Sequence, residues 1–406
     1  MNDENRQAGA ADLLAPLHPS DPLPPFVRAR GASYFTADGR EYVDLNEMRV
    51  VLGQENEAFI RALTDALHSV TAPKNTRFPA KEQLLSLLDE ATNGAFAAIH
   101  LTSSGSEAVE SAVRLAQKLT GRSEILSFWN SIHGRTYLSS SMSGKPQRKA
   151  GYGALAPGVV FLPYPDCLSC PMKRAGGCGF ACLEMASRIY ETASAQDACA
   201  VIVEPYQGSG VIVPPEGYLK KLQNWAKARG MLFIVDEIQS GMGRTGNLFR
   251  YQQEGLEPDM LLTGKALGNG MHIAAVLSRT PLATEDLHGF AGGSGDDAVA
   301  CAAACEVFRQ LDRGLLAHVQ SVSRTLQEGL TALEANEYVL TCRSCGLAAA
   351  IVLRNAPTCE RVHHALTQRG FLPGRQENVL FLKPPYVVTN EQISAFLAAL
   401  RQELST

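Results

Sequence analysis

Two side chains capable of acid and amine chemistry follow two short apolar runs in the middle of the chain. Residues 232–235 form an apolar run that is typical of a buried strand, and Asp236 ends it. Residues 260–263 form a second such run, and Lys265 follows between two small residues. Ligands of open α/β sheets bind at the carboxyl ends of the strands. Burial there lowers the pKa of a lysine and makes its amine a usable nucleophile.

A lysine and an acid at neighbouring strand ends suit pyridoxal phosphate. This cofactor needs a lysine to form a Schiff base and an acid to hold the proton of its pyridine nitrogen. Taken alone, Lys265 is more simply a solvated lysine and Asp236 an acidic strand terminus. Their occurrence together, in this order, favours the cofactor.

The segments around these residues resemble a known family. DEIQSGMGRTG at 236–246 and GKALGNG at 264–270 are similar to class III aminotransferases, which belong to the fold-type-I pyridoxal phosphate enzymes. The resemblance covers about residues 30–400. It implies that Lys265 is the Schiff-base lysine, that Asp236 pairs with the ring nitrogen, and that Gln239 lies near the phenolic oxygen of the ring.

The expected fold is α/β, with a large domain around a mainly parallel sheet and a smaller α+β domain. Strand, helix and strand patterns over 199–235 indicate a βαβ unit of that sheet. We expect a flexible arm at 1–25, the N-terminal part of the small domain at 26–56, the large cofactor-binding domain at 57–288 and the C-terminal small domain at 289–406. The segment 164–184 reads as a cysteine-rich insert in the large domain.

A phosphate site is expected where residues 103–107 (SSGSE) lead into a helical pattern. Ser104 and Glu107 fit a capping box, and a helix N-terminus offers free backbone N–H groups to an anion. A plain helix cap without ligand is the more common meaning of this pattern. The family resemblance implies instead that Gly105 and Ser106 bind the phosphate of the cofactor.

Three further residues are assigned by the resemblance. His133 corresponds to a family histidine near the ring, although a core histidine satisfied by the backbone fits equally well. Ile132 stands where the family has an aromatic residue that stacks on the ring. An isoleucine there loses the stabilisation of about 0.5–1.5 kcal/mol that an aromatic pair provides. Glu204 lies in EPYQG, similar to the Glu-Pro-x-Gln-Gly of the family.

Two positions depart from the family on the substrate and phosphate sides. Phe381 stands where most members have an arginine that grips the α-carboxylate, so Glu204 is free for another partner and Lys383 is a weaker candidate for that grip. Gly293 stands at the position of a threonine that reaches the phosphate in the neighbouring subunit. Ser294 is the nearest hydroxyl that could replace it; a flexible glycine-rich loop is the alternative.

Four cysteines crowd into the insert with the spacing C-x2-C-x7-C-x3-C. Cys167, Cys170, Cys178 and Cys182 have the form of a thiolate metal site, with zinc preferred over an iron–sulfur cluster. Mammalian 4-aminobutyrate aminotransferases are similar in carrying a C-x-x-C motif. Free thiols, or disulfides formed on oxidation, are the alternative. In either case, we expect the four cysteines to stabilise the structure and not to react with the substrate.

Composition limits the class of protein. The chain has 406 residues, a formal net charge of −4 and ten cysteines. This charge does not favour nucleic acid, and no apolar run approaches the roughly 20 residues of a membrane span. The N-terminus lacks the pattern of a secretory signal. We therefore expect a cytoplasmic protein, and the resemblance implies a homodimer.

The sequence thus predicts a pyridoxal phosphate-dependent aminotransferase that acts on small-molecule amines and carbonyls. Phe381 suggests an amine without a standard free α-carboxylate, such as one at a peptide terminus. Racemase or epimerase chemistry with the same lysine, and a non-catalytic homologue, are the alternatives. The stretch 241–246 also matches the dinucleotide pattern G-x-G-x-x-G, which is weak evidence without a helix opening at its end.

Overall fold

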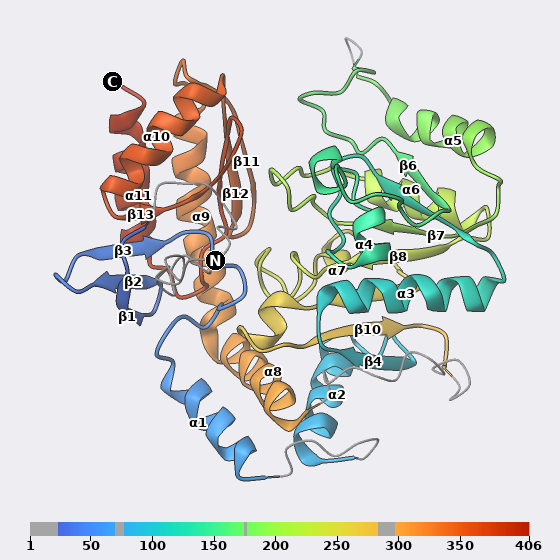
Figure 1. The fold of residues 1–406 in the computed structure, drawn as a ribbon, viewed down its shortest axis with the longest axis horizontal. Coiled ribbons are helices and arrows are strands. Elements are labelled where there is room, and N and C mark those ends of the chain that lie inside the picture. The colour runs from blue at the N-terminus through green and yellow to red at the C-terminus, as the bar shows by residue number, and fades with distance from the viewer. Residues whose placement is uncertain (1–22, 70–76, 174–176, 283–296, 406) are drawn as a thin grey trace, which may run out of the picture.

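The computed structural model describes residues 23–69, 77–173, 177–282 and 297–405. Two groups of layers lie side by side, one around a large sheet and one around a small antiparallel sheet, with helix α8 (Ala298–Gln310) below and between them (Figure 1). None of the helices in these ranges combines the length and hydrophobicity that crossing a bilayer requires.

The large sheet has seven strands in the order β4-β10-β9-β8-β7-β5-β6. Strand β10 is antiparallel to both of its neighbours, and the other adjacent pairs are parallel. The predicted mainly parallel sheet is thus confirmed. The strands are β4 (Ala98–Thr102), β5 (Glu124–Phe128), β6 (Val159–Leu162), β7 (Ala198–Val203), β8 (Leu232–Asp236), β9 (Met260–Thr263) and β10 (Ala274–Ser278).

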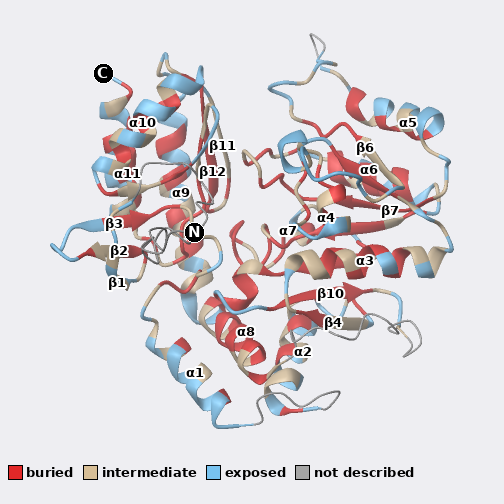
Figure 2. Cartoon of the chain, in the orientation of Figure 1, coloured by how far each residue is buried: buried red, intermediate tan, exposed pale blue. Residues whose placement is uncertain are grey.

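Helices cover both faces of this sheet. Ile234 of β8 packs in a cluster with α3 (Gly105–Thr120), whereas Phe233 and Val235 pack in the cluster that contains α6 (Tyr218–Lys227). Strands covered on both faces are apolar at every position, which is why 232–235 and 260–263 are continuous apolar runs. The buried strands stand out in Figure 2.

Shorter or peripheral helices complete the large part. They are α1 (Glu57–Leu67), α2 (Pro79–Ala91), α4 (Tyr137–Ser141), α5 (Ala181–Ala193), α7 (Arg250–Gln253) and the 3-10 helices η3 (Pro146–Arg148) and η4 (Lys265–Gly268). Helix α6 ends before Gly230, which adopts the left-handed conformation that favours glycine at helix ends.

Two small sheets flank the large part. The N-terminal one has the order β1-β2-β3-β13, and the C-terminal one β11-β12-β15-β14. Strands β2 and β3 form an antiparallel hairpin around Asp38 and Gly39. The strands are β1 (Phe26–Arg30), β2 (Ser33–Thr36), β3 (Glu41–Asp44), β11 (Val339–Cys345), β12 (Ala348–Leu353), β13 (Phe371–Leu372), β14 (Gly374–Gln376) and β15 (Val379–Leu382).

Three helices pack beside the C-terminal sheet (Figure 1): α9 (Leu316–Leu333), α10 (Ala356–Gln368) and α11 (Asn390–Glu403). Helix α9 is preceded by a π-helical turn, Leu311–Leu315, in which Gly314 has a φ of 116°. Strand β13 pairs in parallel with β3, so the first and last parts of the chain share one sheet.

Candidate active site

Asp236 and Lys265 come from the ends of two adjoining parallel strands. Asp236 is the last residue of β8, and its register partner Leu262 lies on β9, three residues before Lys265. Lys265 opens η4 with a left-handed φ of 42°. Its side chain is partly buried, and burial lowers the pKa of the amine; the Asp236 and Glu204 carboxylates oppose that shift. The two predicted chemical groups therefore act on one another.

Asp236 is fixed by His133. The buried His133 donates a hydrogen bond from Nδ1 to Asp236 Oδ2 (2.7 Å), and the Ile238 N–H donates to Asp236 Oδ1 (3.1 Å). Burial alone would lower the pKa of His133, but the hydrogen bond and charge of Asp236, aided by Glu204, raise it. His133 Nε2 is buried and has no partner among the described residues.

The Glu204 carboxylate, which has no arginine partner at position 381, accepts hydrogen bonds from two backbone N–H groups. Oε1 accepts from the Gly208 N–H (3.0 Å) and Oε2 from the Ile132 N–H (3.1 Å). Burial raises the pKa of this carboxyl, while the His133 charge and both N–H groups oppose the rise. Glu204 thereby ties the end of β7 to the loop that carries Ile132 and His133.

Gln239 reaches the same centre from the turn after β8. Its Oε1 is buried and unpartnered within the described ranges. A Cβ at Gly208 would overlap the Gln239 amide, so the absence of a side chain at Gly208 lets the two segments approach. The amide is thus held by close packing with its oxygen left available.

The N-terminus of α3 lies against the loop after His133. Ser104 caps the helix by accepting from the Glu107 N–H (3.2 Å), as predicted. The prediction of a full capping box is wrong, because the Glu107 carboxylate accepts from the N–H of Ser103 (2.8 Å) and not from that of Ser104. Ser106 Oγ accepts from the Arg135 N–H (3.0 Å).

Glycines allow this close approach. A Cβ at Gly134 would overlap Ser139 and come within 2.8 Å of Ser106 Oγ, and one at Gly105 would lie 2.9 Å from Ile238 Cγ2. Gly105 and Ser106 are therefore brought near the end of β8. Ser294, like Gly293, lies outside the described residues.

The C-terminal sheet supplies the other wall. Phe381 of β15 packs against the small hydrophobic cluster that contains Tyr206 and Val211, and its ring lies where a Cβ at Gly374 would stand. The Lys383 amine lies 5.0 Å from the Phe381 ring centre and donates to the Gly208 carbonyl (2.6 Å). Lys383 therefore lies beside Phe381.

Lys145 also acts on this site, although no sequence motif marks it. Its amine donates to Gln376 Oε1 (2.9 Å) on β14, and its charge acts on Lys383. A lysine in a loop without a motif cannot be assigned before the tertiary fold places it.

The cysteine insert does not form the predicted metal centre in this structure. Cys167 is exposed, Cys182 is buried, Cys170 and Cys178 are intermediate, and all four are free thiols. Among the described residues, no three His, Cys, Asp or Glu side chains are arranged to hold a metal ion. The insert is instead tied to β11 by an ion pair between Asp166 and Arg343 (2.8 Å).

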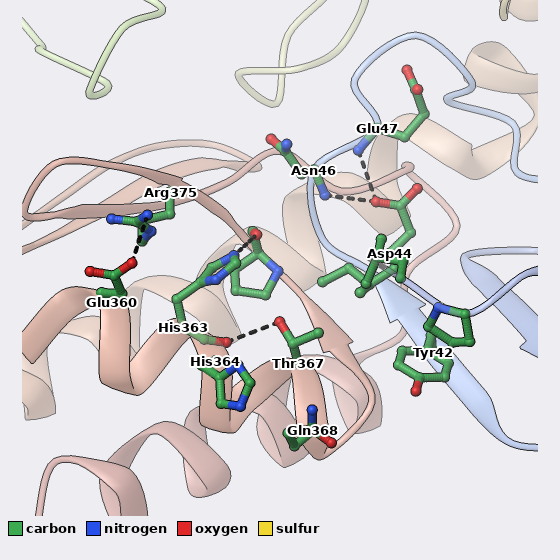
Figure 3. A pocket seen from close by; sticks show the side chains of 14 residues that line it. Tyr42, Asp44, Asn46, Glu47, Glu360, His363, His364, Thr367, Gln368 and Arg375 are labelled. Carbon is green, nitrogen blue, oxygen red and sulfur yellow. Dashed lines mark hydrogen bonds and ion pairs between the residues drawn. The ribbon is translucent and has the colours of Figure 1, made fainter. Parts of the chain in front are cut away.

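A cavity of about 470 Å³ lies elsewhere, between α10 and the N-terminal sheet (Figure 3). Asp44 on β3 and His363 on α10 line it, and His363 Nε2 donates a hydrogen bond to the Pro373 carbonyl (3.1 Å). None of the candidate active-site residues lines this cavity. It is therefore separate from the candidate active site.

Comparisons with known proteins agree with this geometry. A model of the aminotransferase class-III family matches residues 18–404. Acetylornithine aminotransferase of Corynebacterium efficiens is 33% identical over 391 residues, which cover 93% of this chain and 92% of the relative. The corresponding enzyme of Bacillus anthracis is 31% identical over 396 residues, covering 94% and 95%.

The fold is similar to that of solved transaminases. The omega transaminase from Pseudomonas jessenii, solved in complex with PMP, superposes with a TM-score of 0.89 at 23% identity, covering 97% of each chain. An omega-transaminase from Thermomicrobium roseum gives a TM-score of 0.87 at 24% identity, covering 98% of this chain and 97% of that one.

Proposed function

Because this chain belongs to the aminotransferase class-III family and is therefore a pyridoxal phosphate-dependent transaminase, we propose that Lys265 binds the cofactor and Asp236 faces its ring nitrogen. The observation that carries this assignment is that Lys265 and Asp236 lie at the ends of adjoining strands, with His133 hydrogen-bonded to Asp236. The enzyme moves an amino group from a small-molecule amine to a small-molecule carbonyl compound.

The residues present fit the cofactor. The Gln239 oxygen and His133 Nε2 are buried polar atoms without partners among the described residues, and the glycines at 105, 134 and 208 leave room for a close approach. When bound, pyridoxal phosphate supplies an aldehyde that combines with amines and a ring that accepts electrons. The first N–H groups of α3, with Gly105 and Ser106, would hold its phosphate.

Each side chain then has a distinct task. The burial that lowers the pKa of Lys265 raises the share of neutral amine, which can attack a carbonyl and later carry a proton. His133 holds the Asp236 carboxyl group in place through its hydrogen bond, and Asp236 would hold the proton of the ring nitrogen. Gln239 would contact the phenolic oxygen, Ile132 would pack on the ring, and Glu204 would fix the loop that carries Ile132.

Absorbance spectroscopy of the purified protein tests the assignment. We expect a visible band that borohydride removes, with the reduced label mapped to Lys265 by mass spectrometry. Absence of a band after pyridoxal phosphate is added, or a label on another lysine, would contradict it.

We propose that the amine substrate lacks a free α-carboxylate next to the reacting carbon, or carries its carboxylate elsewhere. The apolar ring of Phe381, packed against the hydrophobic cluster that contains Tyr206 and Val211, supports this, because it cannot form the two-pronged hydrogen bond of an arginine. An amine at a peptide terminus belongs to this class. Rapid turnover of common α-amino acids by the unmodified enzyme would contradict the proposal.

We propose zinc, or an iron–sulfur cluster, at Cys167, Cys170, Cys178 and Cys182 only after the insert rearranges. Burial raises the pKa of the Cys167 and Cys182 thiols, and the charges of Cys170 and Cys178 raise it further, which supports the closeness of the four cysteines. Metal analysis of protein purified without chelator would detect it, with Cys178→Ser as the matched variant. A metal content equal in both proteins contradicts this site.

A homodimer in the cytoplasm is also proposed, from the family resemblance and composition. Light scattering after size-exclusion chromatography measures the mass of the assembly, and cell fractionation tests the location. A monomer that retains full activity would contradict the dimer.

A further inference from the structure

The cavity between α10 and the N-terminal sheet has carboxylates on two sides. Asp44 and Glu47 line it from the end of β3, and Glu360 lines it from α10 (Figure 3). Glu47 is paired with Arg49 (2.8 Å), and Glu360 is paired with Arg375 (3.6 Å), which also lines the cavity. The charge of Asp44 is balanced differently from the other two.

Asp44 is a buried carboxylate whose hydrogen-bond donors are neutral. It is 6% exposed, and its Oδ1 accepts from the N–H groups of Asn46 (2.8 Å) and Glu47 (2.9 Å). Burial raises the pKa of Asp44, while these two bonds and one from the Tyr34 hydroxyl oppose the rise. Burying a charge is costly, and a cation that enters the cavity offsets that cost.

Asn46 places a second acceptor beside Asp44. It lines the same cavity, and its side-chain oxygen is buried without a partner among the described residues. Figure 3 shows the Asn46 side chain next to Asp44, at the edge of the cavity. A buried carbonyl oxygen without a donor is unfavourable, so an N–H group of a ligand would be gained at full value. A carboxylate and an amide oxygen side by side suit a protonated amine, which is a cation and a donor at once.

The opposite side of the cavity suits the rest of such a ligand. The Glu360 side chain is 70% exposed, so its carboxylate can accept a further donor besides Arg375. Leu23, Pro24 and Leu372 add apolar lining. A volume of about 470 Å³ accommodates a small organic molecule. Carboxylates on two sides, with apolar side chains in the lining, match a chain of methylene groups that carries an amine at each end.

The segment 44–52 connects this cavity with the active site. The Leu45 carbonyl accepts from the Lys383 N–H (2.7 Å), and the Leu52 N–H donates to Asn269 Oδ1 (2.8 Å). Asn269 ends η4, the turn that Lys265 opens. A ligand bound at Asp44 therefore contacts a segment that is hydrogen-bonded to both walls of the active site.

We propose that this cavity is a regulatory site for an aliphatic diamine, with one ammonium group at Asp44 and Asn46 and the other near Glu360. The ammonium group gains a charge-assisted hydrogen bond from Asp44 and satisfies the Asn46 oxygen. The regulatory role rests on the proposed function, because amines are the substrates of a transaminase. The binding of the diamine does not depend on it.

Calorimetric titration of the cofactor-loaded enzyme with tetramethylputrescine tests the site. Each end of this probe is a tertiary amine, which keeps one N–H when protonated and forms no Schiff base with the cofactor. The titration is made at about pH 8, where an ordinary histidine is neutral and does not repel a cation. We expect Asp44→Asn to weaken binding about tenfold or more, as loss of a charge-assisted hydrogen bond implies.

Two further variants separate binding from folding. Asn46→Asp should bind the probe severalfold more tightly, because it adds a second carboxylate, and a damaged fold does not produce such a gain. Asp38→Asn is the matched control, since Asp38 is an exposed carboxylate on the turn of the same hairpin and does not line the cavity. No binding, or equal affinity in the parent, Asp44→Asn and Asn46→Asp enzymes, would overturn the site.

Amino-transfer kinetics with saturating probe test the regulation. We expect the probe to change KM or kcat of the parent and Asp38→Asn enzymes and to leave Asp44→Asn unaffected at the same concentration. Binding that depends on Asp44 but leaves KM and kcat unchanged would overturn the regulatory role. An equal effect on the Asp44→Asn enzyme would place the probe in the active site and contradict the proposal.

The two proposals fail in different ways. An enzyme that shows the borohydride-sensitive band and transfers amino groups, yet binds no probe, contradicts only the cavity site. An enzyme without the band contradicts the proposed function, while titration with the probe still decides whether the cavity binds a diamine.

Discussion

The two walls of the active site differ in how their charges are balanced. At the ends of β8 and β9, Asp236 is hydrogen-bonded to His133 and to the Ile238 N–H. At the facing wall, Lys383 and Arg244 bond to backbone carbonyls. The first wall has its ionic partners built in, whereas the second keeps positive charge that a ligand can neutralise. The difference suggests that one wall is organised for the cofactor and the other for the substrate.

Removing the amine of the first wall is the largest test of this division. Lys265→Ala should lower transamination on the order of 10⁴-fold, since both the nucleophile and the proton carrier are lost. Stopped-flow measurement of amino transfer checks the rate. Lys149→Ala should leave it unchanged, and a Lys265→Ala enzyme with near-parent rates would assign the chemistry to another residue.

Replacing Asp236, the acid of the first wall, should have the second-largest effect. Asp236→Asn should reduce the rate on the order of 10³-fold, because a fixed negative charge facing the ring nitrogen is lost. The pKa of His133, which Asp236 raises, should also fall. Steady-state kinetics and NMR titration of His133 measure the two effects. An unchanged His133 titration would mean that this pair does not control the charge of the site.

Within the first wall, Glu237 can be compared with its neighbour Asp236, because Glu237 faces the interior of the protein. Burial raises its pKa from 4.5 to about 7, although the Arg250 and Tyr251 N–H groups and Ser240 oppose the shift. Folding therefore favours the protonated carboxyl. This contribution is fully present below pH 4.5 and is lost as the pH rises through about 7, a change of about 3 kcal/mol.

Chemical denaturation between pH 4.5 and 8 measures this dependence. Glu237→Gln should flatten it, with Glu257→Gln at the surface as the control. Parallel pH profiles for the parent and Glu237→Gln proteins would show that the carboxyl does not titrate in this window.

Gly208 joins the two walls and gives the smallest effect. Gly208→Ala places a Cβ against the Gln239 amide, so Gln239 must shift. We expect about a tenfold loss in kcat, as a small misplacement of a positioning group implies. Ser209→Ala is the control. Gly210→Ala is unsuitable, because Gly210 has a φ of 84°, which an alanine adopts only with strain. Additive losses in a Gly208→Ala, Gln239→Ala double variant would show that the two residues act independently.

The first wall could be predicted from the sequence because its signals are local. Apolar runs fix strands β8 and β9, and the residues that follow them fall at the sheet edge without knowledge of the rest of the fold. The helix cap at Ser104 was predicted for the same reason. Its partner Glu107 was assigned wrongly, because whether a side chain reaches one backbone N–H or the next depends on rotamers that a motif does not encode.

The second wall could not be predicted in the same way. Lys145 reaches Gln376 across 231 residues, and Lys383 reaches Gly208 across 175. Such contacts arise only when the two sheets are packed together. Phe381 could be recognised as a departure from the family, but the charge balance around Lys383 depends on Arg244 and Glu204, which no local pattern connects with it.

The parallel pairing of β3 with β13 has a consequence for how the chain folds. Val43 pairs with Phe371, and Arg40 donates to the Gln368 carbonyl, 328 residues further along the chain. During synthesis, the N-terminal hairpin emerges first and must wait for nearly the whole chain before β13 can complete its sheet. Contacts of such long sequence separation slow folding, because the loop they close is costly in entropy. The hairpin edge therefore stays unpaired through most of translation, a period in which chaperone binding would protect it.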